Sequence, residues 1–330
     1  MQVTDTITLM ARSVPDPTHL RVLLSVSSFG AADPEPLERL RATGCEVVPN
    51  PHGRKLTEDE VVELIGDVDA VIAGTEPLNA RVLEQAARLK VISRVGVGLE
   101  NVDLNAALQY GIAVRNTPDA LTDAVAELTL AGMLDAARHV SRMDRALRSG
   151  AWNRHMGVLI RGKAVGIVGL GRIGRRVAEL LAPFNVELLA ADRAPDAEAA
   201  ARLGVEIVEI RELLKRSDIV TLHLPGVGKP IIGADEIALM KQGAILVNAS
   251  RGGLVDEAAL AAALEQGALA SAYVDTFADE PYAGPLTGID TAVLTPHAGS
   301  YAAETRAVME SEAVDNMVDA LREFWPNESP

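Results

Sequence analysis

The chain has 330 residues, of which 48% are hydrophobic, 23% charged and only 3% aromatic. This length suggests two domains, and the composition is typical of a globular protein with aliphatic cores. The formal net charge of −15 repels nucleic acids and anionic membrane surfaces, so we expect neither as a partner. An anionic ligand would need a local cluster of Arg or Lys.

The sequence carries no export or membrane signal. Cys45 is the only cysteine, so no internal disulfide can form, which fits a reducing compartment. No segment reaches the roughly 20 apolar residues needed to span a bilayer. Residues 1–15 lack the basic start and the apolar run of a signal peptide, and they predict a loosely attached N-terminus. We therefore expect a cytoplasmic protein.

Short apolar runs alternate with helical patterns from about residue 21 onward. The runs predict buried strands at residues 21–26, 46–48, 70–73, 91–93 and 112–114. Helix-period stretches lie between them at residues 36–43, 79–89 and 102–110. A long helix is predicted at about residues 120–148, with Thr122 or Asp119 as its N-cap and Gly150 as its stop.

A second alternating series follows the long helix. Its predicted strands are residues 164–168, 187–191, 218–222, 244–248, 271–275 and 293–295. The alternation predicts an α/β protein with two doubly wound domains, each a parallel sheet with helices on both faces. The final helix, about residues 302–324, has no strand after it and is expected to pack on the first domain. One domain is then residues 1–118 plus 300–330 and the other residues 119–299, with the ligand in the cleft between them.

A glycine-rich turn connects the predicted strand at residues 164–168 to a helix. It reads Gly169-Leu170-Gly171-Arg172-Ile173-Gly174. Gly169 permits the tight turn, Gly171 lets a pyrophosphate approach the backbone, and Gly174 lets the helix pack on the strand. The free N–H groups of the helix N-terminus then face the phosphates. This context predicts a dinucleotide-binding site.

The choice of dinucleotide depends on Asp192, which ends the next predicted strand. A carboxylate at this place binds the ribose hydroxyls of NAD and repels the 2′-phosphate of NADP. NAD is therefore the expected cofactor. Arg193, beside Asp192, keeps NADP open as the alternative.

Three potentially reactive side chains follow the ends of separate predicted strands: Arg251, Glu280 and His297. Ligands of open α/β sheets bind beyond the carboxyl ends of the strands, so we expect the three to converge. His297 is suited to removing a hydroxyl proton as hydride leaves, and Glu280 can orient its ring. Arg251 can bind a carboxylate and a carbonyl oxygen with its fork of donors. The set predicts hydride transfer between NAD and a small anionic 2-hydroxy or 2-keto acid.

With these motifs the chain resembles the D-2-hydroxyacid dehydrogenase family from about residue 20 to residue 325, closest in pattern to its D-3-phosphoglycerate dehydrogenases. The resemblance implies a Rossmann NAD-binding domain inserted into a flavodoxin-like substrate or lid domain. It also implies that Arg251, Glu280 and His297 are catalytic and that Asp275 holds the nicotinamide carboxamide. The cofactor residues that it implies are Gly169, Gly171, Arg172, Ile173, Gly174, Asp192, His223, Leu224, Pro225, Ala249, Asp275 and Gly299.

The resemblance also implies a substrate loop at residues 93–103, in which backbone N–H groups around Val97 and Gly98 would bind the substrate carboxylate. By the same resemblance, the long helix and the arm around Trp152 form a homodimer interface, and a core role for Trp152 is the alternative. Arg154 would then reach across the dimer. The implied substrate residues are Arg94, Gly96, Val97, Gly98 and Arg154.

The first candidate substrates are 3-phosphoglycerate and 3-phosphohydroxypyruvate. Residues 73–76 lack the arginine that animal-type phosphoglycerate dehydrogenases carry for the phosphate, which weakens this prediction. The alternatives are a hydroxypyruvate or glyoxylate reductase and a biosynthetic dehydrogenase for a phosphonate-bearing 2-hydroxy acid. Because the chain stops soon after its last predicted helix, we expect a short form without a C-terminal regulatory domain.

Other classes fit the sequence less well. Formate dehydrogenases resemble one another in pairing the His with Gln, unlike Glu280, and phosphite dehydrogenase carries Lys where this chain has Val97. L-specific lactate and malate dehydrogenases carry the glycine turn at the very N-terminus, whereas in this chain it begins at Gly169. No two His residues have ligand spacing on one helix, so we expect no metal. An NAD(H)-sensing, corepressor-like scaffold is the alternative from another class, distinguished by NADH-dependent partner binding with negligible turnover.

Overall fold

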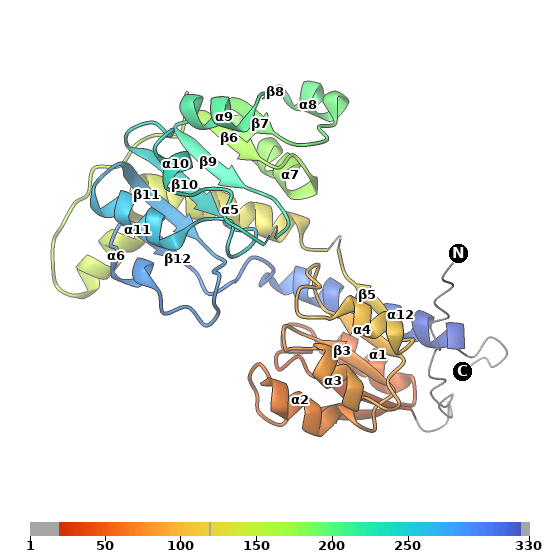
Figure 1. The fold of residues 1–330 in the computed structure, drawn as a ribbon. Coiled ribbons are helices and arrows are strands. Elements are labelled where there is room, and N and C mark those ends of the chain that lie inside the picture. The colour runs from red at the N-terminus through yellow and green to blue at the C-terminus, as the bar shows by residue number, and fades with distance from the viewer. Residues whose placement is uncertain (1–19, 119, 227, 325–330) are drawn as a thin grey trace, which may run out of the picture. The chain divides into compact units, whose positions relative to one another are not determined.

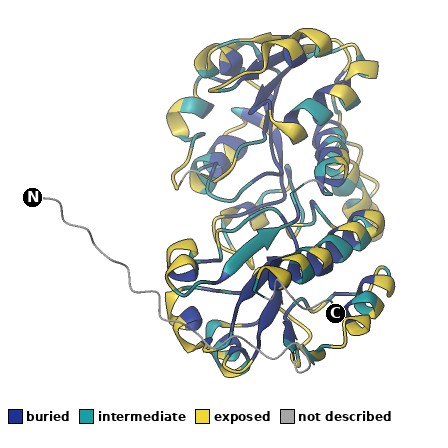
Figure 2. Cartoon of the chain, turned by 90° about the vertical axis from the view of Figure 1, so that its right-hand side faces the viewer, coloured by how far each residue is buried: buried dark blue, intermediate teal, exposed yellow. Residues whose placement is uncertain are grey.

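The computed structural model describes residues 20–118, 120–226 and 228–324 (Figure 1). The prediction for residues 1–15 and the assignment of Asp119 as a helix cap lie outside the described residues. The chain divides into two compact units, one formed by residues 1–121 with 301–330 and the other by residues 122–300. The sequence placed these boundaries at 118/119 and 299/300. In both units the strands carry the buried residues and the helices expose their outer faces (Figure 2).

The first unit, unit 1, contains a five-stranded parallel sheet of strand order β2-β1-β3-β4-β5. This is the flavodoxin-like order, as predicted. Each strand is short and mostly apolar, because both faces of a parallel sheet are covered. The first strand ends at Leu24, two residues before its predicted end. The strands are β1 (Arg21–Leu24), β2 (Glu46–Pro49), β3 (Ala70–Ala73), β4 (Val91–Arg94) and β5 (Ala113–Asn116).

Helices cover both faces of this sheet. The long C-terminal helix α12 contacts α1 and strands β3, β4 and β5, so it packs on unit 1 as predicted. Helix α2 was not among the predicted elements, although Thr57 and Glu60 form a capping box at its start. The helices are α1 (Glu35–Ala42), α2 (Glu58–Ile65), α3 (Ala80–Gln85), α4 (Leu104–Gln109) and α12 (Ala303–Phe324).

The second unit, unit 2, contains a seven-stranded parallel sheet of strand order β12-β11-β10-β9-β6-β7-β8. This is the Rossmann order with one further strand, which confirms the predicted fold class. The edge strand β8 has only three residues and was not predicted. The strands are β6 (Ala164–Val168), β7 (Glu187–Ala191), β8 (Val205–Ile207), β9 (Ile219–Leu222), β10 (Ala244–Asn248), β11 (Leu269–Val274) and β12 (Ala292–Leu294).

The sheet of unit 2 separates two hydrophobic clusters. Alternate strand residues such as Ile167 and Val168 enter opposite clusters, as the two-residue period of a strand requires. Helix α5 contacts α7 and strands β10 and β11, and α11 contacts β11. The shorter helices are α7 (Arg172–Leu181), α8 (Ala197–Leu203), α9 (Ile210–Arg216), α10 (Ala234–Ile237) and α11 (Glu257–Glu265), with 3-10 turns at Ala182–Phe184 and Pro285–Gly288.

The prediction of one helix over residues 120–148 is wrong. The structure has α5 (Thr122–Arg138) and α6 (Val140–Arg148), separated by His139 in the left-handed conformation at φ 56°. The Asp135 carboxylate accepts the Ser141 N–H at 2.8 Å and so caps the second helix. The helical periodicity runs through this break and could not reveal it. Thr122 is the first residue of α5 rather than its cap, and Gly150 follows the end of α6 at φ 85°, as predicted.

Within the described part of the chain, no helix combines the length and the apolar character needed to cross a membrane.

Close packing between α5 and β11 depends on Gly132. A Cβ atom at this position would collide with the ring of Tyr273, which is 1% exposed. We expect Gly132→Ala to lower the free energy of unfolding by about 1–3 kcal/mol, because the core must shift to admit the methyl group. Denaturant unfolding would measure it. Gly288→Ala is the matched control, since a Cβ there meets nothing within 4 Å; equal stabilities of the two variants would contradict the prediction.

Candidate active site

The turn between β6 and α7 uses its glycines in two ways. Gly169 has φ 96°, and a Cβ atom there would collide with the carbonyl oxygen of His223. A Cβ at Gly174 would collide with the carbonyl of Gly169, so these two glycines are required by contacts within the protein. At Gly171, by contrast, a Cβ would meet nothing within 4 Å. The space over Gly171 is therefore open to a ligand that approaches the backbone.

The N-terminus of α7 is built to receive an anion. Gly171 is its N-cap and makes no side-chain cap hydrogen bond, and the first turn of a helix presents backbone N–H groups that can bind an anion. Arg172 at this end is exposed, and Ile173 is half-buried. The predicted pyrophosphate contact thus fits the observed turn.

Asp192 follows β7 and lies next to the same turn. Its carboxylate accepts the Leu170 N–H at 2.7 Å with one oxygen and the Ala194 N–H at 2.9 Å with the other. Because each carboxylate oxygen can accept two hydrogen bonds, both retain capacity for the hydroxyls of a ribose. Arg193 is exposed beside it.

His223 supplies an orphaned polar atom near the turn. Its Nε2 atom pairs with the Thr221 hydroxyl at 2.9 Å, whereas its buried Nδ1 atom has no hydrogen-bond partner among the described residues. Burial lowers the pKa of His223 to about 4, so the ring is neutral at pH 7. Buried polar atoms are normally paired, so Nδ1 fits a place where a ligand binds. Leu224 packs against the core and Pro225 is exposed.

His297 and Glu280 form the hydrogen-bonded pair that the sequence predicted. The Nδ1 atom of His297 lies 2.9 Å and 3.1 Å from the two carboxylate oxygens of Glu280. The Phe277 N–H also donates to Glu280, at 3.0 Å, and fixes the carboxylate. With Nδ1 held in this way, Nε2 is the ring nitrogen left to exchange a proton. The side chains are 44% and 35% exposed, so the pair is accessible to a ligand.

A buried carboxylate sets the loop that carries His297. Asp275 is 0% exposed, and its oxygens accept the N–H groups of Ala298 at 2.8 Å and Gly299 at 2.9 Å. The Thr295 hydroxyl donates to it at 2.5 Å. The Asp275 carbonyl also accepts the His297 N–H at 2.8 Å, and His297 has φ 52°. The nicotinamide carboxamide contact of Asp275 stays a prediction, and in the structure the carboxylate fixes the loop that carries His297.

Arg251 lies on the neighbouring loop, after β10. Asn248 donates its amide to the Arg251 carbonyl at 3.0 Å and so fixes the start of this loop. The Arg251 guanidinium donates to the Ser250 carbonyl at 2.8 Å. A Cβ atom at Gly252 would collide with the Phe277 carbonyl, so the loops after β10 and β11 are in direct contact. Ala249, which begins the Arg251 loop, is 4% exposed.

Arg251, Glu280 and His297 thus follow the carboxyl ends of three adjacent parallel strands, β10, β11 and β12. The structure brings Glu280 and His297 into hydrogen-bond contact and places Arg251 on the loop beside them. The sequence missed Thr295 and the hydrogen bonds of Asp275, because these contacts join residues about 20 positions apart. It also missed Asn248, whose side chain bonds to Ser250 and Arg251 within its own loop.

The predicted substrate loop follows β4 in unit 1. Thr117 binds Gly96 twice, accepting its N–H at 2.8 Å and donating its own N–H to the Gly96 carbonyl at 3.0 Å. Asn116 donates its amide to the Val97 carbonyl at 2.8 Å. The carbonyls are thereby occupied, whereas the N–H groups of Val97 and Gly98 donate to no described residue. Two adjacent free N–H groups can bind a carboxylate.

The two predicted substrate arginines differ in their surroundings. Arg94 ends β4, is half-buried and donates to the Val95 carbonyl. Arg154 is exposed in the segment after α6, and no described residue forms an ion pair with it. Arg94 lies in the substrate loop of unit 1, whereas Arg154 lies in unit 2. Trp152 is 81% exposed, so the alternative of a core role for Trp152 is wrong.

A buried carboxylate that the sequence did not reveal lies at the carboxyl end of β3. Glu76 is 2% exposed and accepts the Ser25 hydroxyl at 2.5 Å and the Gly74 N–H at 3.0 Å. Asn101 donates its amide to the Glu76 carbonyl at 2.7 Å and so connects this loop to the substrate loop. No described Lys or Arg pairs with Glu76.

The described residues also contain no group of three or more His, Cys, Asp or Glu that could hold a metal ion.

Comparison with known proteins agrees with this geometry. Residues 130–299 match the sequence profile of the D-isomer specific 2-hydroxyacid dehydrogenase, NAD binding domain. The chain is 41% identical over 275 residues to D-3-phosphoglycerate dehydrogenase of Methanocaldococcus jannaschii, covering 81% of this chain and 52% of the relative. It is 41% identical over 257 residues to glyoxylate reductase of Aeropyrum pernix, covering 74% and 77%.

Among solved structures, the TT0316 protein from Thermus thermophilus superposes with a TM-score of 0.84 at 36% identity, covering 92% of this chain and 97% of that one. The chain spans about half the length of the phosphoglycerate dehydrogenases that it matches. The matched profile and the relatives of similar length agree with the dinucleotide turn and the His–Glu pair. The chain therefore belongs to the D-2-hydroxyacid dehydrogenase family of NAD-dependent oxidoreductases.

Proposed function

We propose that the chain transfers hydride between C4 of the nicotinamide and C2 of a small D-2-hydroxy acid or its 2-keto acid. Unit 2 binds NAD and unit 1 binds the substrate in this proposal. The observation that carries it is the His297–Glu280 pair, which follows strands of the same sheet that supplies the dinucleotide turn.

NAD, when bound, supplies the acceptor of the hydride in oxidation and its donor in reduction. The Nε2 atom of His297 takes the substrate hydroxyl proton in oxidation and returns it to the carbonyl oxygen in reduction. Glu280 holds Nδ1, fixes the ring orientation and stabilises the imidazolium that forms. Arg251 presents several N–H donors to the carboxylate and the C2 oxygen of the substrate. The free N–H groups of Val97 and Gly98 offer a further carboxylate contact.

We expect His297→Asn to lower kcat by about 10²–10⁴-fold, because the variant cannot exchange the hydroxyl proton. Its Kd for NADH should stay unchanged, since the ring is not part of the nucleotide turn. Steady-state kinetics and NADH fluorescence titration would measure the two quantities.

The control for this variant is His52→Asn, which removes another imidazole ring near a carboxylate, 3.5 Å from Glu60 in unit 1. It should leave kcat and NADH binding unchanged. Normal turnover by His297→Asn would contradict the acid/base assignment.

For the substrate we propose 3-phosphoglycerate and 3-phosphohydroxypyruvate as first candidates. The phosphoglycerate dehydrogenase relatives support them, and Arg94 and Arg154 are the cations that we propose for a second anionic group. A second candidate is a glyoxylate or hydroxypyruvate reductase, which the glyoxylate reductase relatives support. The buried Glu76 carboxylate favours this second candidate, because its charge near the substrate loop opposes a phosphate.

A panel of keto acids decides between them. NADH oxidation is followed with 3-phosphohydroxypyruvate, hydroxypyruvate, glyoxylate and phosphonopyruvate. We expect the highest kcat/KM for 3-phosphohydroxypyruvate and a loss of about ten-fold or more for it in Arg94→Gln, as for a hydrogen bond to a charged group. The kcat/KM for glyoxylate should change less.

If the parent chain prefers glyoxylate or hydroxypyruvate, the second candidate is the substrate class. If it prefers phosphonopyruvate, the substrate is a biosynthetic phosphonate. No turnover of any compound while NADH still binds would contradict the enzymatic proposal. That result would favour an NAD(H)-sensing, corepressor-like scaffold.

We also propose that the protein is cytoplasmic, as its single cysteine suggests. We further propose a homodimer formed through α5, α6 and the arm at residues 151–159. The support is a concentration of exposed apolar side chains, which mark interaction surfaces. Trp152 is 81% exposed and Met156 95%. The others on this surface are Val140, Leu147, Val158 and Leu159.

We expect the double variant Trp152→Ser and Met156→Ser to shift the molecular mass in solution from dimer toward monomer, because it removes the two most exposed apolar side chains of the arm. Size-exclusion chromatography with light scattering would measure the mass. Leu108→Ser is the control, since Leu108 is 76% exposed on α4 of unit 1. A monomeric parent chain, or a dimer unaffected by the double variant, would contradict the proposed interface.

A further inference from the structure

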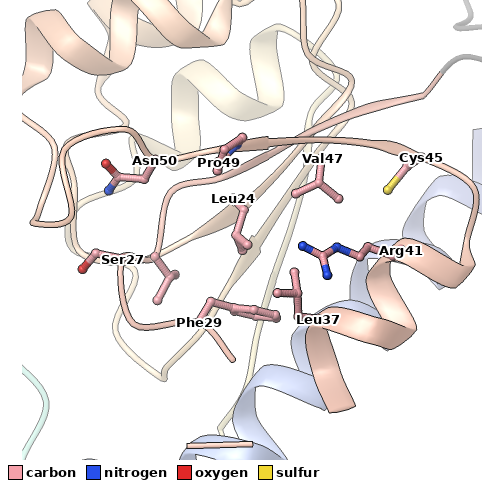
Figure 3. A pocket seen from close by; sticks show the side chains of 10 residues that line it. Leu24, Ser27, Phe29, Leu37, Arg41, Cys45, Val47, Pro49 and Asn50 are labelled. Carbon is pink, nitrogen blue, oxygen red and sulfur yellow. The ribbon is translucent and has the colours of Figure 1, made fainter. Parts of the chain in front are cut away.

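A groove with a cavity volume of about 430 Å³ lies at the edge of the sheet in unit 1 (Figure 3). Small-molecule sites in proteins commonly have volumes of about 300–1,000 Å³. The apolar walls come from Leu24, Phe29, Leu37 and Val47. Neither the substrate loop at residues 94–98 nor any residue of unit 2 lines it. The groove is therefore separate from both candidate contributions to catalysis.

The groove follows from the way the edge of this sheet is covered. Cys45, Val47 and Pro49 alternate along the chain and face the same side of edge strand β2. Val48, on the opposite face, packs against the core of unit 1. Helix α1 has eight residues and contacts β2 and α12, and its Leu37 and Arg41 line the groove without filling it. A parallel sheet normally has both faces covered, and here one corner is left for another occupant.

The opposite wall carries a single cation. Leu37 and Arg41 are four residues apart on α1 and therefore share one face of the helix, toward the groove. Figure 3 shows the guanidinium of Arg41 directed into the groove between Leu37 and Val47. By contrast, Arg39 on the same helix pairs with Glu35 at 3.5 Å and with Asp315.

The charge of Arg41 is not balanced within the groove. None of the ten described lining residues is a carboxylate, and Arg41 forms no ion pair with a described residue. The Asn50 amide is already occupied by the carbonyls of Ser25 and Arg54. An apolar groove with one available guanidinium is complementary to a ligand that has an apolar body and one negative charge.

We propose that this groove is a second ligand site, which binds a small monocarboxylate with a branched aliphatic or aryl body. The carboxylate pairs with Arg41, and the body lies against Leu24, Phe29, Leu37 and Val47. This site is independent of the proposed hydride transfer, so each can fail without the other.

Cys45 is the only cysteine of the chain and lines the groove, so it reports occupancy directly. The rate of its alkylation by iodoacetamide is measured with 4-methylpentanoate and with the neutral amide of the same shape. The reaction is run at alkaline pH, because burial raises the pKa of the Cys45 thiol. At about ten times Kd, the acid should lower the rate about ten-fold. The amide should protect much less.

Two variants separate the charge from the shape of the groove. Arg41→Gln should abolish protection by the acid, whereas the control Arg39→Gln should retain it. Val47→Phe fills the groove, keeps the charge and should also abolish protection. In each case the ratio of rates with and without ligand is compared, so a change in the thiol's own reactivity does not matter.

Equal protection by the acid and the amide would overturn the proposal, and so would undiminished protection in Arg41→Gln. An absence of protection by the acid in the parent chain would overturn it as well. Protection that rises with protein concentration in the absence of ligand would assign the groove to a second copy of the chain instead.

Discussion

The geometry of the candidate active site depends on the carboxylate of Asp275. A fully buried charge is unfavourable unless hydrogen bonds compensate it, and here two backbone N–H groups and a hydroxyl do so. Those bonds hold the following loop in a turn that places His297 in the left-handed region, a conformation that non-glycine residues adopt only when their surroundings impose it. The ring of His297 can then meet Glu280. The proposed acid/base pair is thus positioned by a residue that need not touch the substrate.

The sequence predicted most of the scaffold because the relevant signals are local. Buried parallel strands are short apolar runs, and such runs located eleven of the twelve described strands to within two residues at each end. The glycine turn was recognisable because strand, glycines and helix are contiguous. Arg251, Glu280 and His297 could be grouped because parallel strands end at the same edge of a sheet.

The features that the sequence did not reveal depend on contacts between residues distant in the chain or on very short elements. The break at His139 is stabilised by Asp135, and the helical period continues through it. Strand β8 has three residues and gives almost no periodic signal. Glu76 is buried through bonds to Ser25 and Gly74, which no spacing rule connects. The groove beside Arg41 is lined by residues of β1, β2, α1 and the loop after β1, so it is a property of packing rather than of any one residue.

The insertion of unit 2 into unit 1 has a consequence for synthesis on the ribosome. Helix α12 binds the sheet of unit 1 through bonds such as that from the Ser93 hydroxyl to the Ala313 carbonyl, 220 residues apart, and that from Asn316 to the Asn116 carbonyl. The strands of unit 1 therefore emerge before α12 and lack one of the helices that cover their sheet until α12 has been synthesised. Unit 2 is continuous in the chain and can complete its core while unit 1 is still open. Of the two units, unit 1 is thus the one that finishes folding last, and its partly covered sheet is exposed to chaperones in the interval.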